Sequence, residues 1–100
     1  MKILILGDLM GNSGQKALQE NLNKIIKDKN IDFTILNGEN AAEDGKGITK
    51  NIANKLFDLG VDVITSGNHI WDKQETTDYI DKENRLLRPA NLAKGSFGKG

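Results

Sequence analysis

The sequence predicts an α/β domain with a mostly parallel sheet and flanking helices. Three apolar runs of strand length, at residues 2–6, 32–36 and 61–65, alternate with two segments of helical periodicity, at residues 14–29 and 49–59. Such alternation indicates right-handed crossovers between parallel strands, with helices covering both faces of the sheet. A chain of 100 residues with 37% hydrophobic content has room for one small domain, so residues 1–100 are expected to form a single domain.

Each of these elements has its own local signals. The first strand ends at Gly7, and the next helix is predicted by four apolar side chains on one face, namely Leu18, Leu22, Ile25 and Ile26. The second helix should begin after Thr49, which is suited to cap it, and should end at Gly60. The third strand is predicted by the branched residues of VDVIT.

The last third of the chain predicts two shorter elements and a loop. Asp72 and Glu75 have the spacing of a capping box, which predicts a short helix through Ile80. The run RLLRPAN predicts a fourth strand that ends at Pro89. The final ten residues, NLAKGSFGKG, contain three glycines and little that could pack, so we expect a loop there.

Charge and residue usage disfavour several classes of function. Fourteen Lys and Arg balance 14 Asp and Glu, so no long-range field favours general nucleic-acid binding or an anionic membrane. The chain has no cysteine, which excludes disulfides, thiolate metal sites and a cysteine nucleophile. The apolar run at residues 3–6 is too short for a signal-peptide core or a membrane span, so we expect a soluble, cytoplasmic protein.

Polar side chains follow each of the three predicted parallel strands. Asp8 follows the first strand, Glu39 and Asn40 follow the second, and Asn68 and His69 follow the third, each group directly after a glycine. In parallel sheets the carboxyl ends of the strands form the ligand-binding edge, so we expect these side chains on one rim. Carboxylate and amide oxygens with one imidazole suit Mg²⁺, Mn²⁺ or iron. A bridging carboxylate can hold two such ions about 3.5 to 4 Å apart for phosphoester hydrolysis.

His69 is the only histidine of the chain. Its neighbour Asn68 could hold a metal while the imidazole faces the substrate as a general acid near neutral pH. Structural alternatives stay open: Asp8 as a turn residue or helix cap, Glu39 as a solvated turn residue, Asn68 bonding the backbone, and His69 in a purely structural role. The glycine-containing segments at residues 11–16 and 43–47 lack the spacing of a nucleotide-binding P-loop.

Four sequence blocks, in register and at predicted strand ends, carry a family resemblance: ILGD, NGENAA followed by GKG, SGNHIWDK, and RPAN. Across essentially all 100 residues the chain resembles the first part of the YmdB-like metallophosphoesterases, within the calcineurin-like superfamily. The resemblance implies the N-terminal part of an α/β sandwich, two divalent metal ions (Fe, Mn or Mg), and a small phosphodiester substrate such as 2′,3′-cyclic AMP. It also implies that Asp8, Glu39, Asn40 and Asn68 are metal ligands, with Glu39 bridging, and that His69 protonates the leaving oxygen.

Three features depart from the wider superfamily pattern. That pattern has an aspartate after the second glycine, where this chain has Glu39 and Asn40. Asp8 is followed by Leu9 and Met10, where that pattern has any residue and then histidine. Family members are also longer and bring further histidine ligands from their second half, whereas no histidine follows His69 here. The resemblance therefore implies an incomplete metallophosphoesterase domain, with weak metal binding by these residues alone. The alternative from another class is a non-catalytic ligand- or partner-binding module, and an unpaired sheet edge would favour homo-oligomers.

Overall fold

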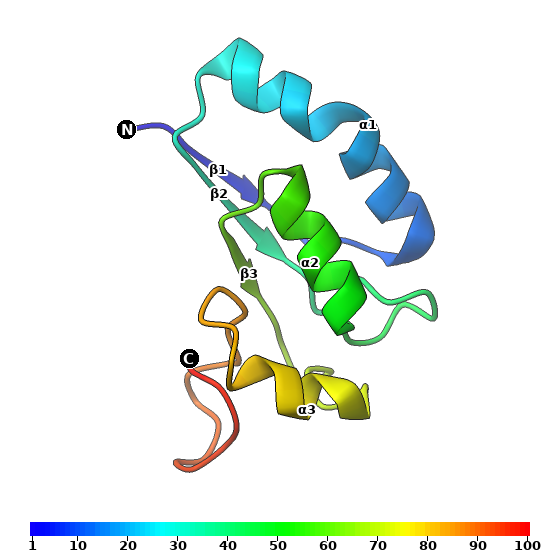
Figure 1. Ribbon diagram of the computed structural model, residues 1–100, viewed down its shortest axis with the longest axis vertical. Helices are drawn as coiled ribbons and strands as arrows, with labels where there is room; N and C mark the ends of the chain where they lie inside the picture. The colour runs from blue at the N-terminus through cyan, green and yellow to red at the C-terminus, as the bar shows by residue number, and fades with distance from the viewer.

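The computed structural model describes residues 1–100 and contains three strands and three helices (Figure 1). In chain order they are β1 (Ile3–Leu6), α1 (Gly11–Lys29), β2 (Phe33–Asn37), α2 (Lys50–Leu59), β3 (Val63–Thr65) and α3 (Gln74–Ile80). All strands are parallel and lie in the order β1-β2-β3. The predicted α/β class, with a parallel sheet and flanking helices, is confirmed.

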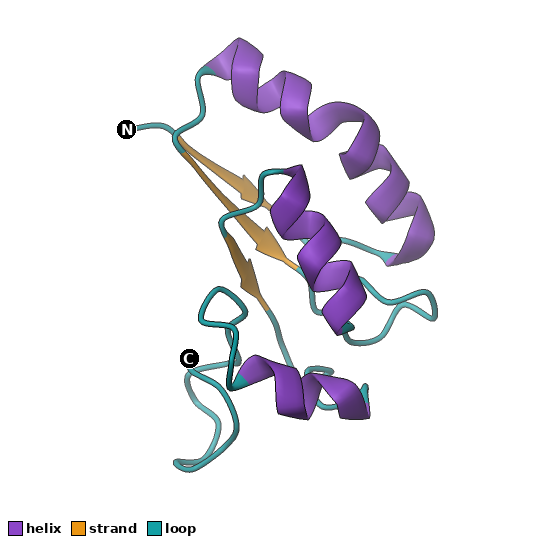
Figure 2. Cartoon of the chain, in the orientation of Figure 1, coloured by secondary structure: helices purple, strands orange, loops and turns teal.

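Helices α1 and α2 lie on the same side of the sheet, although the sequence predicted cover on both faces (Figure 2). The strand order explains the difference, because two right-handed crossovers that step in the same direction place both helices on one face. The covered face carries Leu36 and Ile64, which are buried. On the opposite face Ile3 and Ile5 are 51% and 73% exposed.

The hydrophobic core lies between the covered face and the two helices. Leu22 of α1 and Leu56 of α2 are fully buried and belong to the same cluster as Leu36 and Ile64. Burial of one such side chain stabilises the fold by roughly 1.5 to 3 kcal/mol. α1 begins three residues before the predicted start at Gly14, and no side chain caps it.

Both ends of α2 are as predicted. The Oγ1 atom of Thr49 accepts a hydrogen bond from the Ile52 N–H at 3.2 Å. Gly60 ends the helix with a φ of 116°, a left-handed conformation that favours glycine. A Cβ atom at this position would lie only 2.9 Å from Ile26 of α1, so Gly60 also lets the two helices approach closely.

The predicted capping box of the last helix is wrong. α3 begins at Gln74, with Lys73 at the cap position and no side-chain cap. The carboxylate of Asp72 is instead 2.8 Å from the ring of His69. The Asp72 carboxylate, which the sequence pattern predicted to cap α3, therefore contacts the imidazole of His69 instead.

The predicted fourth strand at residues 85–91 is also wrong. Leu87 donates a backbone hydrogen bond to Ile64 of β3, but the next amide, that of Arg88, donates to Lys99. The ladder with β3 therefore stops at an isolated bridge. As predicted, residues 91–100 contain no helix or strand. None of the three helices is long and apolar enough to cross a membrane.

Replacement of Leu22 tests the packing of α1 on the sheet. We expect Leu22→Ala to lower the free energy of unfolding by about 2 to 5 kcal/mol, because a fully buried leucine leaves a cavity. The matched control is Ile25→Ala on the same helix, which is 37% exposed and should cost about 1 kcal/mol or less. Guanidinium unfolding measures both, and equal losses would contradict the packing described here.

An ion pair after α3 gives stability a dependence on pH. Arg85 Nε donates to Glu83 Oε1 at 2.7 Å, and the Arg85 guanidinium lies 4.0 Å from the centre of the Phe57 ring. The hydrogen bond from Arg85 lowers the pKa of Glu83 below its ordinary 4.5. A carboxylate with a lowered pKa contributes stability above its unfolded pKa and loses it as the pH falls through the folded value.

We therefore expect Glu83→Gln to be less stable than the wild type near neutral pH, by about 1 kcal/mol or less, because the Arg85 side chain is 51% exposed and solvent screens the pair. The difference should shrink as the pH falls below 4.5, where the wild-type carboxyl becomes protonated. Denaturant unfolding of both proteins from pH 7 to pH 3 measures this. A difference that stays constant over the whole range would show that the ion pair is not its source.

Candidate active site

Three loops meet at the carboxyl end of the sheet, one from each strand (Figure 1). Backbone hydrogen bonds join them: Leu9 donates to Asn37 at 3.1 Å, and Gly38 donates to Thr65 at 2.8 Å. Gly11, at the start of α1, donates to Asn40 at 3.0 Å. The rim that the sequence predicted is therefore formed.

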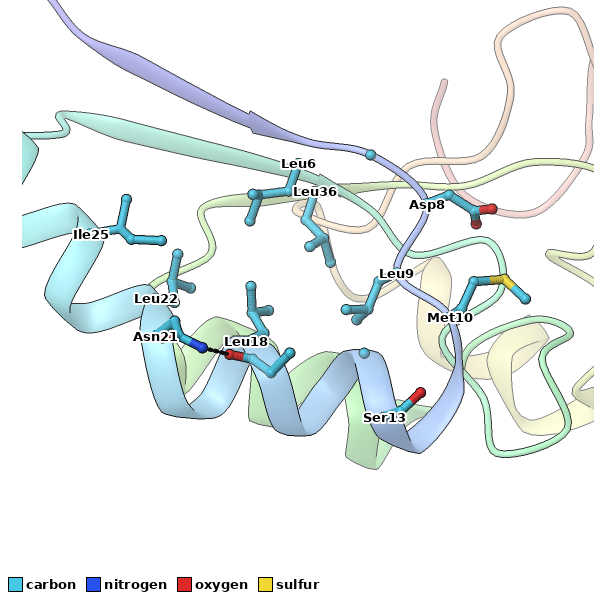
Figure 3. A pocket seen from close by; sticks show the side chains of 13 residues that line it. Leu6, Asp8, Leu9, Met10, Ser13, Leu18, Asn21, Leu22, Ile25 and Leu36 are labelled. Atoms are coloured by element: carbon cyan, nitrogen blue, oxygen red, sulfur yellow. Dashed lines mark hydrogen bonds between the residues drawn. The ribbon is translucent and has the colours of Figure 1, made fainter.

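Asp8 and Asn40 lie in direct contact on this rim. Asn40 Nδ2 donates a hydrogen bond to Asp8 Oδ1 at 2.8 Å. The contact leaves the second oxygen of Asp8 and the amide oxygen of Asn40 free for a further partner. Asp8 lies at one end of an apolar groove of about 520 Å³ between α1 and the β1 edge, and its carboxylate is directed away from the apolar side chains (Figure 3).

The carboxylate of Glu39 lies against the backbone of Gly67. A Cβ atom at Gly67 would overlap the Glu39 carboxylate carbon and both of its oxygens. Gly67 does not have a positive φ, so the close approach rather than the backbone conformation requires glycine there. This contact places Glu39 beside the residue that precedes Asn68, so the β2 and β3 loops share one small space.

Asn68 and His69 differ in their surroundings. Asn68 is exposed, and its side chain makes no protein hydrogen bond. The His69 Nδ1 atom is 2.8 Å from Asp72 Oδ2, and its side chain is 32% exposed. Ile70, which follows, is buried and anchors the turn to the core. His69 is thus held by its own turn while its ring reaches solvent.

The loop at residues 43–47 supports the turn that carries His69, a role that sequence reasoning missed. Gly47 has a φ of 77°, and a Cβ atom there would lie 2.9 Å from the His69 carbonyl oxygen. Lys73 Nζ lies 2.7 Å from Asp44 Oδ2, and this hydrogen bond lowers the pKa of Asp44 below 3.8. The two glycines of DGKG were the available signal, since they indicate a tight turn that can approach a neighbouring backbone.

Gln15 is a second residue that sequence reasoning missed. It is buried, and its Nε2 atom donates to the Ala41 carbonyl at 2.7 Å. Gln15 precedes Leu18 and Leu22 at helical spacing, so a polar residue on the apolar face of α1 was the available signal. The side chain ties α1 to the loop that carries Glu39 and Asn40.

The donors on the rim fit a hard divalent cation. They are two carboxylates and two amides, and oxygen donors of this kind are preferred by Mg²⁺ and Mn²⁺. No group of three or more His, Cys, Asp or Glu side chains is placed to hold a metal. A metal bound at this rim would therefore need oxygen donors besides the carboxylates of Asp8 and Glu39, and the amides of Asn40 and Asn68 are the ones that the sequence predicts. The ligand set stays a prediction, and of its four members Asp8 and Asn40 are the two in direct contact.

The fold of this chain matches part of two solved structures, one of which is named a phosphatase. A crystal structure of a novel phosphatase from Mycoplasma pneumoniae matches it with a TM-score of 0.91 and 31% identity, over 100% of this chain and 37% of that one. A crystal structure of a hypothetical protein from Thermus thermophilus also gives a TM-score of 0.91, with 37% identity over 100% of this chain and 38% of that one.

The family can be stated more closely. The model of the family described as YmdB-like protein matches residues 4–100, and the chain belongs to this family. It is similar to a Bacillus subtilis (strain 168) protein named 2′,3′-cyclic-nucleotide 2′-phosphodiesterase, with 47% identity over 100 residues. That match includes 100% of this chain and 38% of the relative, so the chain spans well under half of the length of that protein. The resemblance seen in the four sequence blocks is confirmed.

Replacement of Gly67 tests the close contact with Glu39. In the full-length protein, Gly67→Ala should displace the Glu39 carboxylate and weaken Mn²⁺ binding by about 10-fold or more, the effect expected when the support of a ligand is lost. The matched control is Gly7→Ala on the same rim, where an added Cβ meets nothing within 4 Å. Calorimetric titration with Mn²⁺ measures both, and unchanged affinity of Gly67→Ala would rule out Glu39 as a ligand in this position.

Proposed function

We propose that this chain forms part of a metal-dependent phosphodiesterase acting on small phosphodiesters such as 2′,3′-cyclic nucleotides. The observation that carries the proposal is the convergence on one rim of the Asp8–Asn40 pair, of Glu39 against Gly67, and of the partly exposed His69. The named activity of the Bacillus subtilis relative supports the substrate class. Cytoplasmic localisation and homo-oligomers stay predictions from the sequence.

Asp8, Glu39, Asn40 and Asn68 would hold the metal, with Glu39 shared between two ions (Fe, Mn or Mg). When bound, such ions supply a nucleophilic hydroxide and neutralise charge on the phosphoryl oxygens. The protein contributes the placement of its oxygen donors. Asp8 is oriented by the hydrogen bond from Asn40, and Glu39 is confined by the backbone of Gly67. Donors fixed in this way lose little freedom on binding a cation.

His69 would act on the leaving group. As the new bond between phosphorus and the attacking oxygen forms, the bond to the ester oxygen breaks and its electron pair stays on that oxygen. His69 Nε2 then gives its proton to the same oxygen, which leaves as an alcohol. The Nε2 atom suits this role because Nδ1 is already engaged by Asp72 and the side chain is 32% exposed.

Replacement of His69 tests this assignment. In the full-length protein with Mn²⁺, His69→Ala should lower kcat by about 10²-fold or more for a 2′,3′-cyclic nucleotide, because its alkoxide leaving group needs a proton. The loss should be much smaller for a p-nitrophenyl phosphodiester, whose phenolate leaves without one. Lys24→Ala is the control, since Lys24 is an exposed residue of α1 away from the rim and its side chain makes no hydrogen bond. Unchanged turnover of the cyclic nucleotide by His69→Ala would show that His69 is not the proton donor.

A further inference from the structure

Asp72 forms a hydrogen bond with the ring of His69 that the proposed chemistry does not by itself require. The Asp72 Oδ2 atom is 2.8 Å from His69 Nδ1. An ionised carboxylate can only accept a hydrogen bond, so Nδ1 carries a proton and donates it to Asp72. Nε2 is then the ring nitrogen left to face a substrate, and a ring that donates a proton from Nε2 carries a proton on both nitrogens, with Nδ1–H still directed at Asp72.

The backbone holds both partners of this contact in place. The Asp72 N–H donates to the His69 carbonyl at 3.0 Å, and the Ile70 N–H donates to the Gly67 carbonyl at 3.1 Å, which closes the turn. On the outer side, a Cβ atom at Gly47 would lie 3.4 Å from Asp72 Cβ, so the neighbouring loop packs against the aspartate. The carboxylate and the imidazole thus start from a fixed separation.

The cation next to Asp72 in the sequence does not pair with its carboxylate. Lys73 follows Asp72 directly, but its ammonium group lies 2.7 Å from Asp44 of the neighbouring loop. Asp72 also does not cap α3, because no side chain caps that helix. The one side-chain hydrogen bond of Asp72 is the bond with His69.

We infer that Asp72 is a positioning residue, which fixes the orientation of the His69 ring so that Nε2 faces the leaving oxygen of a bound phosphodiester. The inference rests on the proposed function, in which His69 is the proton donor. Partners of this kind, which orient a reacting group without touching substrate, typically contribute about 10- to 100-fold to activity.

The test uses the full-length protein with Mn²⁺ and two substrates, a 2′,3′-cyclic nucleotide and a p-nitrophenyl phosphodiester. Asp72→Asn should lower kcat for the cyclic nucleotide by about 10- to 100-fold with KM unchanged, and should leave kcat for the p-nitrophenyl ester within about threefold. In a His69→Ala background the same change should have no further effect, because residues that act as one unit are not additive. Asp72→Glu, which keeps the carboxylate, should retain more activity than Asp72→Asn.

The matched control is Asp78→Asn, which removes the same charge from an exposed position on α3 with no side-chain hydrogen bond and should leave both rates unchanged. An equal loss on both substrates, or a further loss in the His69→Ala background, would show that Asp72 acts otherwise than through His69 and would overturn the inference. Wild-type turnover by Asp72→Asn alongside a strong loss in His69→Ala would overturn it too, while leaving the proposed function intact. Wild-type turnover by His69→Ala would overturn both.

Discussion

Parallel pairing of β1, β2 and β3 aligns Leu6 with Leu36 and Asn37 with Thr65, so three loops leave the sheet at nearly the same level. Strands of three to five residues have little freedom to slip, because a shift of one residue would turn Leu36 out of the core. The register that buries the core is therefore also the register that brings the polar loops together. Stability and site geometry have a common origin in this sheet.

Glycine sets how closely the loops approach. A Cβ at Gly38 would come within 2.8 Å of Ile64, and one at Gly67 would overlap the Glu39 carboxylate. Neither glycine has a positive φ, so each is needed for space rather than for backbone conformation. Gly47 combines both requirements, with a φ of 77° and the His69 carbonyl beside it. The polar side chains converge because these glycines have no side chains that would keep the loops apart.

The features that the sequence predicted correctly depend on local chemistry or on the simple rule that parallel strands share an edge. Thr49 and Gly60 bound α2 through contacts within a few residues, and the rim follows from the order of strands and glycines. The wrong predictions depend on contacts that spacing does not encode. Helices would have covered both faces of the sheet only if the second crossover had stepped in the opposite direction from the first, and both step in the same direction here. The capping role of Asp72 failed because the imidazole of His69 competes for its carboxylate.

The Asp8–Asn40 contact and the His69–Asp72 contact join residues at very different separations along the chain. Asp8 and Asn40 are 32 residues apart, so their contact exists only when β1 and β2 are paired. His69 and Asp72 are three residues apart within one turn, which the core holds mainly through the buried Ile70. Weakening of β1, whose outer face is exposed at Ile3 and Ile5, would therefore separate the oxygen donors before it disturbed the imidazole. Any segment that covers this face would strengthen the Asp8–Asn40 contact and leave the His69–Asp72 pair largely unchanged, because that pair depends on its own turn.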